Sequence, residues 1–353
     1  MVIGIVNNLY YPYLRGSGVE VIAAKMETEL RAAGHEVFVI TTKPARAEQT
    51  DSRDCYYLAS HYHNLKNWPA SLKICWHAGQ LFLPCHRTKL KKILKERQPD
   101  LIITHNLVGI GASLPRLLRQ RGIRHEHVLH DIQLLHPSGL MYWGKEKIIE
   151  TLPAKIYQTF TSRALRGAAK IISPSQWLLN LHCAHGFFIN QESIVRPNFI
   201  LNRQPAQPLH RPVNFVFTGQ LEKHKGVAVL LTAWKLAALS DEQAQLIIAG
   251  GGSLSDWLKK QAVQQKNLTV AGYLNREEIN KLLTVADVVV VPSLVYENSP
   301  TSLWEAAERG LRAIASNLGG TPELAPYLNL DLVPPGDTGA LANAIKKIIT
   351  DIK

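Results

Sequence analysis

Two glutamates stand eight positions apart in the segment VVVVPSLVYENSPTSLWEAAERG, residues 288–310. Glu297 precedes a Ser-Pro pair, and Glu305 falls in the second turn of the helix that this pair predicts. Because a carboxylate accepts hydrogen bonds, Glu297 could hold a neutral polyol, and Glu305 could hold two adjacent hydroxyls such as those of a ribose. The alternative interpretation is a surface-loop glutamate followed by an exposed helical charge.

A phosphate site is predicted directly after Glu297. Ser299 followed by Pro300 is typical of an N-cap and a first helical residue. The preceding run DVVVVPS is typical of a buried strand, so this helix would begin at the strand's carboxyl end. Unpaired N–H groups and the positive end of the helix dipole favour an anion there. The N–H groups concerned belong to Thr301, Ser302 and Leu303.

A second motif, FTGQLEKHKG at residues 217–226, follows an apolar run and opens another helix. Gly219 would let the backbone approach a ligand. Lys225, directly before Gly226, stands where a cation could neutralise a diphosphate leaving group. The glycine turn in QLIIAGGGS and the helix start in GTPEL are similar signals, each weak by itself.

The elements that must position these groups alternate between strands and helices. Residues 2–8 form a short apolar run, residues 19–33 have helical spacing with Gly34 as a C-cap, and residues 35–42 predict the next strand. Strands are also predicted at residues 99–106, 125–131 and 169–175. This alternation predicts a parallel sheet with helices on both faces.

The same alternation restarts after a proline-rich stretch, RPNFILNRQPAQPLHRPV. The predicted domains are therefore residues 1–203 and residues 204–353. Predicted strands of the second domain lie in NFVFTG, QLIIAG, LTVAGY, DVVVVPS, LRAIASN and DLVPPG. Ligands of doubly wound sheets bind at the carboxyl ends of the strands. Two such domains, facing each other across a cleft, would place the catalytic site in that cleft.

The excess of basic over acidic residues is confined to the first half of the chain. Residues 1–205 hold 26 Lys and Arg against 14 Asp and Glu, whereas residues 206–353 hold 14 of each. This asymmetry indicates an anionic partner, such as a phospholipid surface, a lipid-linked pyrophosphate or a nucleic acid. The alternative interpretation of each basic cluster by itself is a solvated helix face. The start of the chain lacks signal-peptide features, which predicts a cytoplasmic location. The basic excess of the first half adds the expectation of peripheral attachment at the inner face of the membrane.

The cysteines predict reduced thiols rather than a structural centre. Cys55, Cys75, Cys85 and Cys183 show no CxxC pattern and no disulfide framework spacing. Cys75, His77, Cys85 and His86 could be imagined as a zinc site, but their spacing matches no usual zinc pattern. We expect no metal and no cofactor.

The ordered set TGQLEKHKG, IAGGG, VAGY, ADVVVVPSLVYENSPTSLWEAAERG and IASNLGGTPEL resembles the donor domain of GT4-type retaining glycosyltransferases (glycosyl transferases group 1). The Glu-x7-Glu spacing is the hallmark of that family. GSGVE, GHEVFVITT, HEHVLHD and RPNF extend the resemblance into the first half. It implies the GT-B fold, an N-terminal acceptor domain and a C-terminal nucleotide-sugar domain, both Rossmann-like.

The resemblance also implies roles for individual residues. Glu297 matches the glutamate that contacts the donor sugar, and Glu305 matches the one that holds the ribose. Lys225 matches the lysine on the donor diphosphate. His130 matches a histidine near the reacting sugar, although a histidine alone at a strand end is more often structural. The remaining donor-site positions are Gly16 and Gly18 in the glycine loop, Gly219 and Gln220, and the backbone near Gly272 and Tyr273 for the base.

Three departures from the family pattern stand out. Gln220 replaces a common arginine, so that one cationic diphosphate contact becomes a neutral amide. ENSP replaces the commoner EGFG before the helix. The chain also stops before the final helix that usually crosses back to the N-terminal domain in this family.

The implied reaction is transfer of a hexosyl group from a nucleotide-diphosphate sugar, with UDP or GDP as the nucleotide, to an anionic, lipid-linked or polysaccharide acceptor. The anomeric configuration would be retained. No DxD-type pair stands at a strand end, so Lys225 and helix dipoles would replace a metal. A sugar-nucleotide epimerase or phosphorylase of the same fold is the alternative. A non-catalytic nucleic-acid-binding protein is disfavoured because aromatic stacking platforms are missing among the basic residues.

Overall fold

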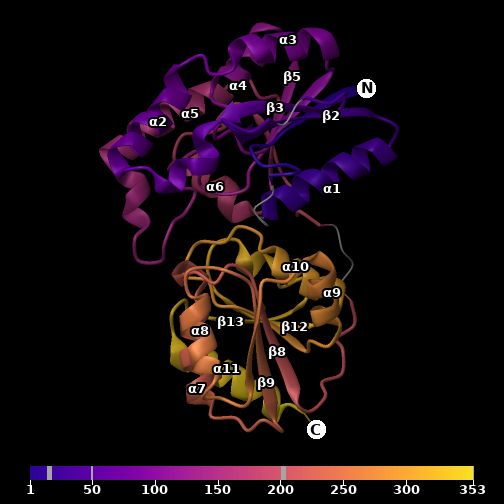
Figure 1. Ribbon diagram of the computed structural model, residues 1–353, viewed down its shortest axis with the longest axis vertical. Coiled ribbons are helices and arrows are strands. Elements are labelled where there is room, and N and C mark those ends of the chain that lie inside the picture. The colour runs from indigo at the N-terminus through magenta and orange to yellow at the C-terminus, as the bar shows by residue number, and fades with distance from the viewer. Residues whose placement is uncertain (14–17, 49–50, 200–203, 353) are drawn as a thin grey trace. The chain divides into compact units, whose positions relative to one another are not determined.

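The computed structural model (Figure 1) describes residues 1–13, 18–48, 51–199 and 204–352. The chain divides into two units. Unit 1 holds residues 1–140 and 147–198, and unit 2 holds residues 141–146 and 199–353. The predicted boundary after residue 203 falls on residues 200–203, which lie outside the described part of the chain.

Within the described residues of unit 1, seven parallel strands form one sheet in the order β3-β2-β1-β4-β5-β6-β7. The strands are β1 (Val2–Val6), β2 (Glu36–Pro44), β3 (Cys55–Ser60), β4 (Leu101–Thr104), β5 (Arg124–Val128), β6 (Lys170–Ser173) and β7 (Glu192–Val195). The α-helices are α1 (Gly18–Ala32), α2 (Ala70–Phe82), α3 (Arg87–Arg97), α4 (Ser113–Gln120), α5 (Leu152–Leu165) and α6 (Gln176–Ala184).

Alternation along the strands divides the core of unit 1 between two faces of its sheet. In β1, Ile3 and Ile5 belong to the side on which α1 packs, whereas Val6 belongs to the cluster that contains Leu90 of α3 and Leu114 of α4. Successive side chains of a strand point to opposite faces, so one apolar strand supplies both layers.

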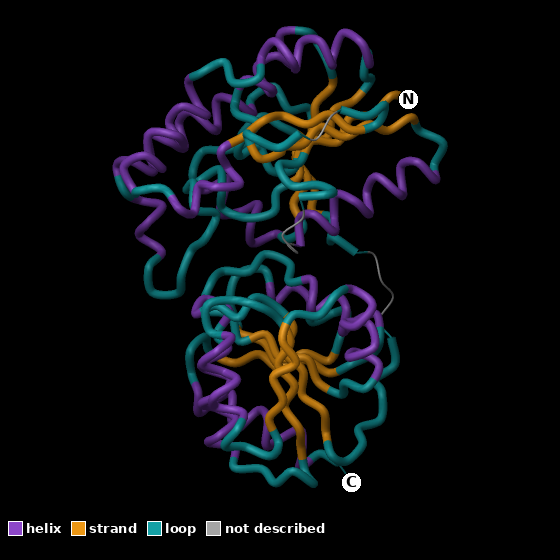
Figure 2. Tube along the Cα trace, in the orientation of Figure 1, coloured by secondary structure: helices purple, strands orange, loops and turns teal. Residues whose placement is uncertain are grey.

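Within the described residues of unit 2, six parallel strands form a sheet in the order β10-β9-β8-β11-β12-β13. Figure 2 shows helices on both sides of this sheet. The strands are β8 (Val213–Thr218), β9 (Ala244–Ala249), β10 (Leu268–Gly272), β11 (Val288–Val291), β12 (Arg312–Ser316) and β13 (Asn329–Val333). The α-helices are α7 (Val227–Ala237), α8 (Ser255–Ala262), α9 (Arg276–Thr284), α10 (Thr301–Glu308) and α11 (Thr338–Thr350).

Both sheets have a point where the winding reverses. In unit 2 the chain proceeds outward from β8 through β9 to β10, and then from β11 through β12 to β13. The crevice outside the carboxyl ends of the strands at such a switch point is the usual ligand site of an open α/β sheet. Residues that follow β8 and β11 therefore form the first place to search, and β1 and β4 are their counterparts in unit 1.

The predicted alternation of strands and helices is confirmed, and Gly34 follows α1 in the left-handed conformation expected of a C-cap. Two strands were not predicted, β3 and β7, and each lies at an edge of the unit 1 sheet. Among the residues that the structure describes, no helix is both long and apolar enough to cross a membrane.

Candidate active site

The loops that follow β8 and β9 are held together by Glu222. Its Oε1 accepts a hydrogen bond from the Ser253 backbone N–H at 2.8 Å, and its Oε2 accepts one from the Ser253 hydroxyl at 2.6 Å. Backbone bonds from Leu221 to Gly251 and from Leu254 to Leu221 add to this link. The segment that leads to Lys225 is thus fixed at the carboxyl edge of the unit 2 sheet.

Gly226 allows this segment to touch the loop after β11. Its φ is +72°, and a Cβ at this position would lie 1.7 Å from the Pro292 carbonyl oxygen. A side chain is therefore excluded by both the backbone conformation and the lack of space. This close contact brings the residue before Gly226, Lys225, beside the residues after β11.

Lys225 and Glu297 form an ion pair across the switch point. The Lys225 Nζ lies 2.6 Å from Glu297 Oε1, and the Ser293 hydroxyl donates to the same oxygen at 2.7 Å. The side chains of Lys225 and Glu297 are only 28% and 18% exposed. The structure thus brings together two residues that the sequence analysis assigned separately to the donor site.

The pKa of Glu297 reflects a competition between burial and positive charge. Burial acts to raise the pKa of this carboxyl, but the Lys225 ammonium and the hydrogen bonds from Lys225 and Ser293 outweigh burial and lower it. Burial and the nearby Lys225 charge lower the pKa of His224. The Lys225–Glu297 pair thus places an ionised carboxylate and an ammonium at one point of the sheet edge.

The backbone of Glu297 is fixed from the other side by the loop after β12. The Gly320 N–H donates to the Glu297 carbonyl at 2.8 Å. A Cβ on Gly319, whose φ is +64°, would lie 2.3 Å from the same carbonyl oxygen. The predicted helix start GTPEL and the glycine before it, Gly319, therefore also hold the backbone of Glu297 in place.

Glu305 has a different cationic partner. Its carboxylate pairs with Arg276, the first residue of α9, and the Glu305 side chain is 13% exposed while that of Arg276 is 56% exposed. The two glutamates of the motif therefore have different surroundings: Glu297 faces Lys225, and Glu305 faces Arg276. The contact with Arg276 was not predicted from the sequence.

The predicted N-cap at Ser299 is wrong. The cap residue is Pro300, with φ −58° and ψ 123°, and α10 begins at Thr301. The reason is a bond inside the segment, because the Trp304 indole N–H donates to the Ser299 hydroxyl at 2.7 Å. The Leu303 N–H donates to the Pro300 carbonyl at 3.2 Å, so it already has a partner within the first turn.

A short stretch of the first half of the chain, residues 141–146, belongs to unit 2. The Trp143 N–H donates to the Leu294 carbonyl at 2.9 Å, and the Tyr296 N–H donates to the Met141 carbonyl at 2.9 Å. The Tyr296 hydroxyl also donates to Glu146 Oε1 at 2.8 Å. Sequence reasoning missed this strap, which supports the loop carrying Glu297, because no local pattern signals a contact over this separation.

In unit 1, His130 follows β5 and pairs with His105, which follows β4. His105 Nδ1 lies 2.8 Å from His130 Nε2, and the two rings stack with centroids 5.0 Å apart. Burial is the main cause that lowers the pKa of both imidazoles. The pKa of His105 falls to about 3, and that of His130 falls well below 6.5. Both imidazoles are therefore neutral at physiological pH, able to donate with one ring nitrogen and accept with the other.

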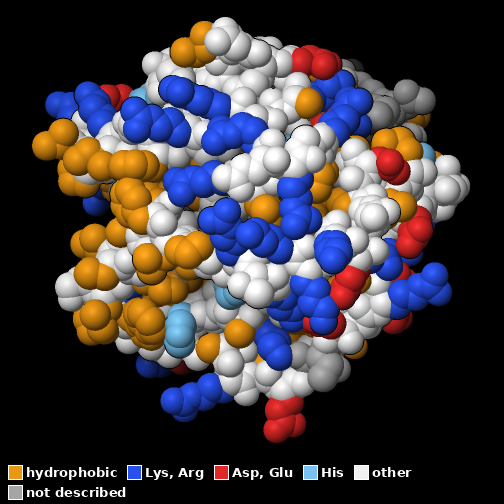
Figure 3. Space-filling view, turned by 90° about the horizontal axis from the view of Figure 1, so that it is seen from above, with side chains coloured by type: hydrophobic (Ala, Val, Ile, Leu, Met, Phe, Trp, Pro, Cys, Tyr) orange, Lys and Arg blue, Asp and Glu red, His pale blue; other side chains and the backbone are white. Residues whose placement is uncertain are grey.

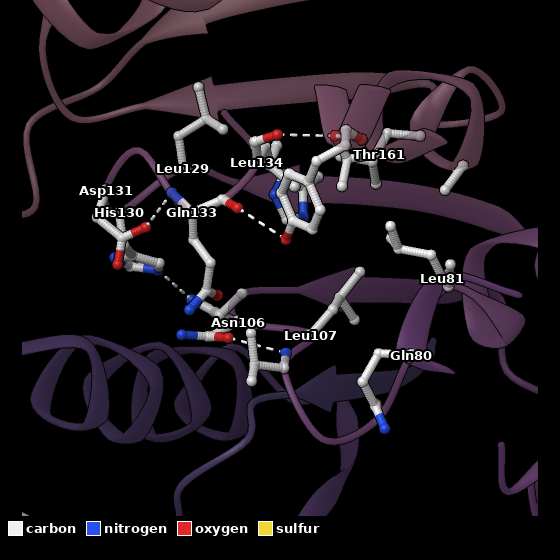
Figure 4. Close-up of a pocket in the computed structure, with 18 of the residues that line it drawn as sticks. Gln80, Leu81, Asn106, Leu107, Leu129, His130, Asp131, Gln133, Leu134 and Thr161 are labelled. Atoms are coloured by element: carbon white, nitrogen blue, oxygen red, sulfur yellow. Dashed lines mark hydrogen bonds between the residues drawn. The ribbon is translucent and has the colours of Figure 1, made fainter. Parts of the chain in front are cut away.

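His130 lines a cavity of about 70 Å³ within unit 1. Figure 4 shows His130 and Asp131 on one side of this cavity and Gln80 and Leu81 on the opposite side. Burial raises the pKa of Asp131 to about 6, although the Gln133 N–H donates to its Oδ1 at 2.7 Å and opposes the rise. The cavity therefore combines an apolar wall with a neutral histidine and an easily protonated carboxyl group.

The other predicted donor residues are placed as follows. Gly219 and Gln220 are exposed at the end of β8. The carbonyl of Gly272 accepts a backbone bond from Gly250 at 2.7 Å, and Tyr273 is 78% exposed. Gly18 begins α1, whereas Gly16 lies outside the described residues.

Residues 16–200 match the family described as Glycosyltransferase Family 4, and residues 212–351 match the one described as Glycosyl transferases group 1. The chain is 25% identical to an uncharacterised 42.6 kDa protein in the cps region of Klebsiella pneumoniae, over 92% of this chain and 87% of that protein. It is 32% identical to a glycogen synthase of Mycobacterium tuberculosis, over 71% of this chain and 66% of that enzyme.

Among solved structures, the Anabaena protein HepE in complex with UDP and glucose is similar in fold. Its TM-score is 0.70 at 19% identity, with 99% of this chain and 90% of that chain covered. The first family match includes more than half of the chain. The protein is thus a glycosyltransferase that belongs to glycosyltransferase family 4, with two parallel Rossmann-like sheets of the GT-B type.

Proposed function

We propose that the protein transfers a hexosyl group from a nucleoside-diphosphate sugar, with retention of the anomeric configuration, to an anionic, lipid-linked or polysaccharide acceptor. The observation that carries this proposal is the Lys225–Glu297 pair at the switch point of the unit 2 sheet, 2.6 Å apart and mostly buried. An ammonium fits a pyrophosphate oxygen, and a carboxylate fits sugar hydroxyls. Their side-by-side placement fits the point where a sugar joins a diphosphate.

The leaving group of this reaction needs positive charge. As the bond from the anomeric carbon to the phosphate oxygen breaks, its electron pair leaves with the diphosphate. Glu297 uses one of the three N–H groups of the Lys225 ammonium, and the others would stabilise that developing charge. The N-terminus of α10 would add the positive end of its dipole. In this proposal no divalent cation is needed for charge balance.

Glu297 would act on the sugar rather than as a covalent nucleophile. Its carboxylate is held by Lys225 and Ser293, which spread its charge and fix its direction. Such a group accepts hydrogen bonds from sugar hydroxyls and stabilises positive charge that develops on the ring. If the acceptor attacks from the side of the departing phosphate, that phosphate oxygen is the nearest base for the acceptor's proton, and the configuration is retained.

Glu305 would hold the ribose of the nucleotide, and His130 would contact the transferred sugar. The low pKa of His130 keeps the imidazole neutral, so it can donate a hydrogen bond without repelling the developing positive charge of the sugar. We propose UDP as the first nucleotide to test, because the structure of HepE is a complex with UDP and glucose. The basic balance of residues 1–205 supports an anionic acceptor.

The donor is tested by thermal unfolding with UDP-, GDP- and ADP-sugars in turn. A true donor raises the melting temperature by mass action. At a donor concentration of about 100 times Kd, the free energy of unfolding should rise by roughly 2.7 kcal/mol. Product analysis by NMR then follows the anomeric configuration. An epimerase would convert the nucleotide sugar without any acceptor, and a phosphorylase would require inorganic phosphate. Either result would replace the transferase proposal.

A further inference from the structure

Two helices of unit 1 leave apolar side chains in solvent. On α5, Leu152 is 72% exposed and Ile156 is 51% exposed, and Phe160 follows four residues later on the same helical face. On α2 and just beyond it, the exposed apolar residues are Leu72, Ile74, Phe82 and Leu83. The ring centroids of Phe82 and Phe160 lie 4.5 Å apart, so the exposed apolar residues of the two helices meet at this pair. We refer to these seven residues as the α2/α5 face.

The surroundings of the α2/α5 face are basic. Lys and Arg number one in α2, six in α3, two in α4 and two in α5. The four helices together hold one acidic residue, Glu96. Figure 3 shows hydrophobic side chains gathered at the left of the view, where α2 and α5 lie in Figure 1, with Lys and Arg side chains beside them. The α2/α5 face and the positively charged side chains are therefore neighbours on one surface.

A pocket of about 240 Å³ lies where the two kinds of surface meet. Its lining includes two residues of the α2/α5 face, Phe82 and Leu83, and two arginines, Arg87 and Arg116. The Arg116 guanidinium donates to the Leu81 carbonyl at 3.0 Å, which fixes its direction. Within the described residues, neither arginine forms an ion pair with a carboxylate. Two guanidinium groups beside an apolar wall suit a phosphate that is attached to an acyl chain.

The chemistry of this surface favours one class of partner. A second copy of the chain would bring two positively charged faces together, which repel. A single-stranded nucleic acid would stack its bases on exposed aromatic rings. Five of the seven residues of the α2/α5 face are aliphatic, and its two aromatic rings, Phe82 and Phe160, already pack edge-to-face against each other. Stable attachment to a membrane usually needs two signals, apolar insertion and attraction to anionic lipid, and both are present here.

We propose that the α2/α5 face docks on an anionic phospholipid leaflet, with a headgroup phosphate held by Arg87 and Arg116. This inference extends the proposed function, because a protein held at a leaflet can meet a lipid-linked acceptor. Leaflet binding itself requires neither the donor nor its site in unit 2.

Flotation with vesicles tests the proposal, without any nucleotide sugar. The protein should float with vesicles of phosphatidylcholine mixed with phosphatidylglycerol, and much less with phosphatidylcholine alone. Leu152→Glu with Ile156→Glu should reduce the bound fraction at least about tenfold. Val263→Glu is the matched control, because Val263 is 88% exposed in unit 2 and should bind like the wild type.

The basic contribution is tested by a second pair of variants. The double variant Arg87→Glu, Lys92→Glu should bind anionic vesicles more weakly and with a smaller dependence on salt. The double variant Lys259→Glu, Lys260→Glu carries the same charge change on α8 and should bind like the wild type. Equal binding to neutral vesicles, or equal loss in both charge pairs, would overturn the proposal. Vesicle binding that stays intact in the Leu152→Glu, Ile156→Glu variant while self-association is lost in sedimentation would assign the face to a second copy instead. Thermal shifts with nucleotide sugars, without vesicles, show separately whether the donor site is intact.

Discussion

Lys225 Nζ and Glu297 Oε1 lie 2.6 Å apart, although 72 positions separate the two residues in the chain. Each reaches the pair from the carboxyl end of a neighbouring strand, β8 for the lysine and β11 for the glutamate. Gly226 and Gly319 allow the close backbone contacts on which this placement depends. Because each of the two charges stabilises the other, we expect that neither acts alone.

A double-mutant cycle tests this coupling. Lys225→Met and Glu297→Gln should each lower kcat/KM by about 100-fold, because each removes half of one charge-stabilising unit. The double variant should lose about as much as either single variant, rather than the product of both losses. Steady-state kinetics with the identified donor measures this, and thermal unfolding confirms that each variant is folded. A loss in the double variant equal to the product of the two single losses would show that the two residues act independently.

The two glutamates of the motif should differ in the step that they affect. Glu297→Ala should mainly lower turnover, whereas Glu305→Ala should mainly weaken binding of the nucleotide, by about tenfold in Kd. Loss of the Glu305–Arg276 pair should cost little stability, since Arg276 is 56% exposed. Calorimetric titration of UDP and measurement of kcat separate the two effects.

Glu277→Ala serves as the control for Glu305→Ala. Glu277 lies on α9 and pairs with Lys281 on the surface. This variant should leave both the affinity and the turnover unchanged. Small, equal effects from Glu297→Ala and Glu305→Ala would contradict the proposed division of roles.

Gly226 should tolerate no side chain. Gly226→Ala forces a Cβ toward the Pro292 carbonyl at a φ of +72°, so we expect a loss of at least about 3 kcal/mol in the free energy of unfolding. Gly272→Ala is the matched control, because Gly272 has a similar φ of +76° with no atom within 4 Å of its Cβ position. That variant should lose only about 1 kcal/mol. Urea unfolding measures both, and equal losses would show that strain alone, rather than the close contact, restricts Gly226.

The His105–His130 pair should affect turnover without affecting binding of the nucleotide. His130→Ala removes the neutral donor next to the unit 1 cavity, so we expect kcat to fall by about 10–100-fold. His105→Phe retains a stacked ring but loses the 2.8 Å bond to His130, and it should give a smaller decrease in kcat. Thermal shifts with UDP should match the wild type in both variants. A loss of the UDP shift would place His130 on the nucleotide rather than on the sugar.

The parts of the fold that the sequence predicted are those with strong local patterns. VVVV in β11 is a continuous apolar run, which is the pattern of a strand buried on both faces. The edge strand β3, CYYLAS, mixes polar and apolar residues, and β7, ESIV, is only four residues long and partly exposed. Edge strands are covered less by neighbours, so their sequences carry a weaker signal.

The site divides in the same way between local and distant information. Lys225 and Glu297 could be predicted to approach each other, because each follows a strand of a parallel sheet. The partner of Glu305, Arg276, comes from another helix, and the Trp304 side chain takes the hydroxyl of Ser299 that a local capping rule assigned to the backbone. Contacts of this kind depend on the packing of whole elements, which spacing alone does not encode.

The pH dependence of stability should report on Asp131. In the folded protein burial raises its pKa from an ordinary 3.8 to about 6, so the native state holds this proton more tightly than the unfolded chain does. Stability from this group is therefore complete below about pH 4 and is lost as the pH rises through 6. Asp131→Asn cannot ionise and keeps an oxygen that can accept from Gln133. It should exceed the wild type in free energy of unfolding at pH 8 by about 3 kcal/mol.

The comparison with Asp131→Ala separates charge from hydrogen bonding. Alanine also removes the ionisable group, but it leaves the Gln133 N–H without its 2.7 Å acceptor, so this variant should gain less than the asparagine variant at pH 8. Urea unfolding at pH 5, 6, 7 and 8 measures all three proteins. The advantage of Asp131→Asn should shrink toward pH 5, because the wild-type carboxyl then carries its proton. An advantage that stays constant over this range would mean that the carboxyl does not change protonation there, and that something other than its buried charge limits the stability of the wild type.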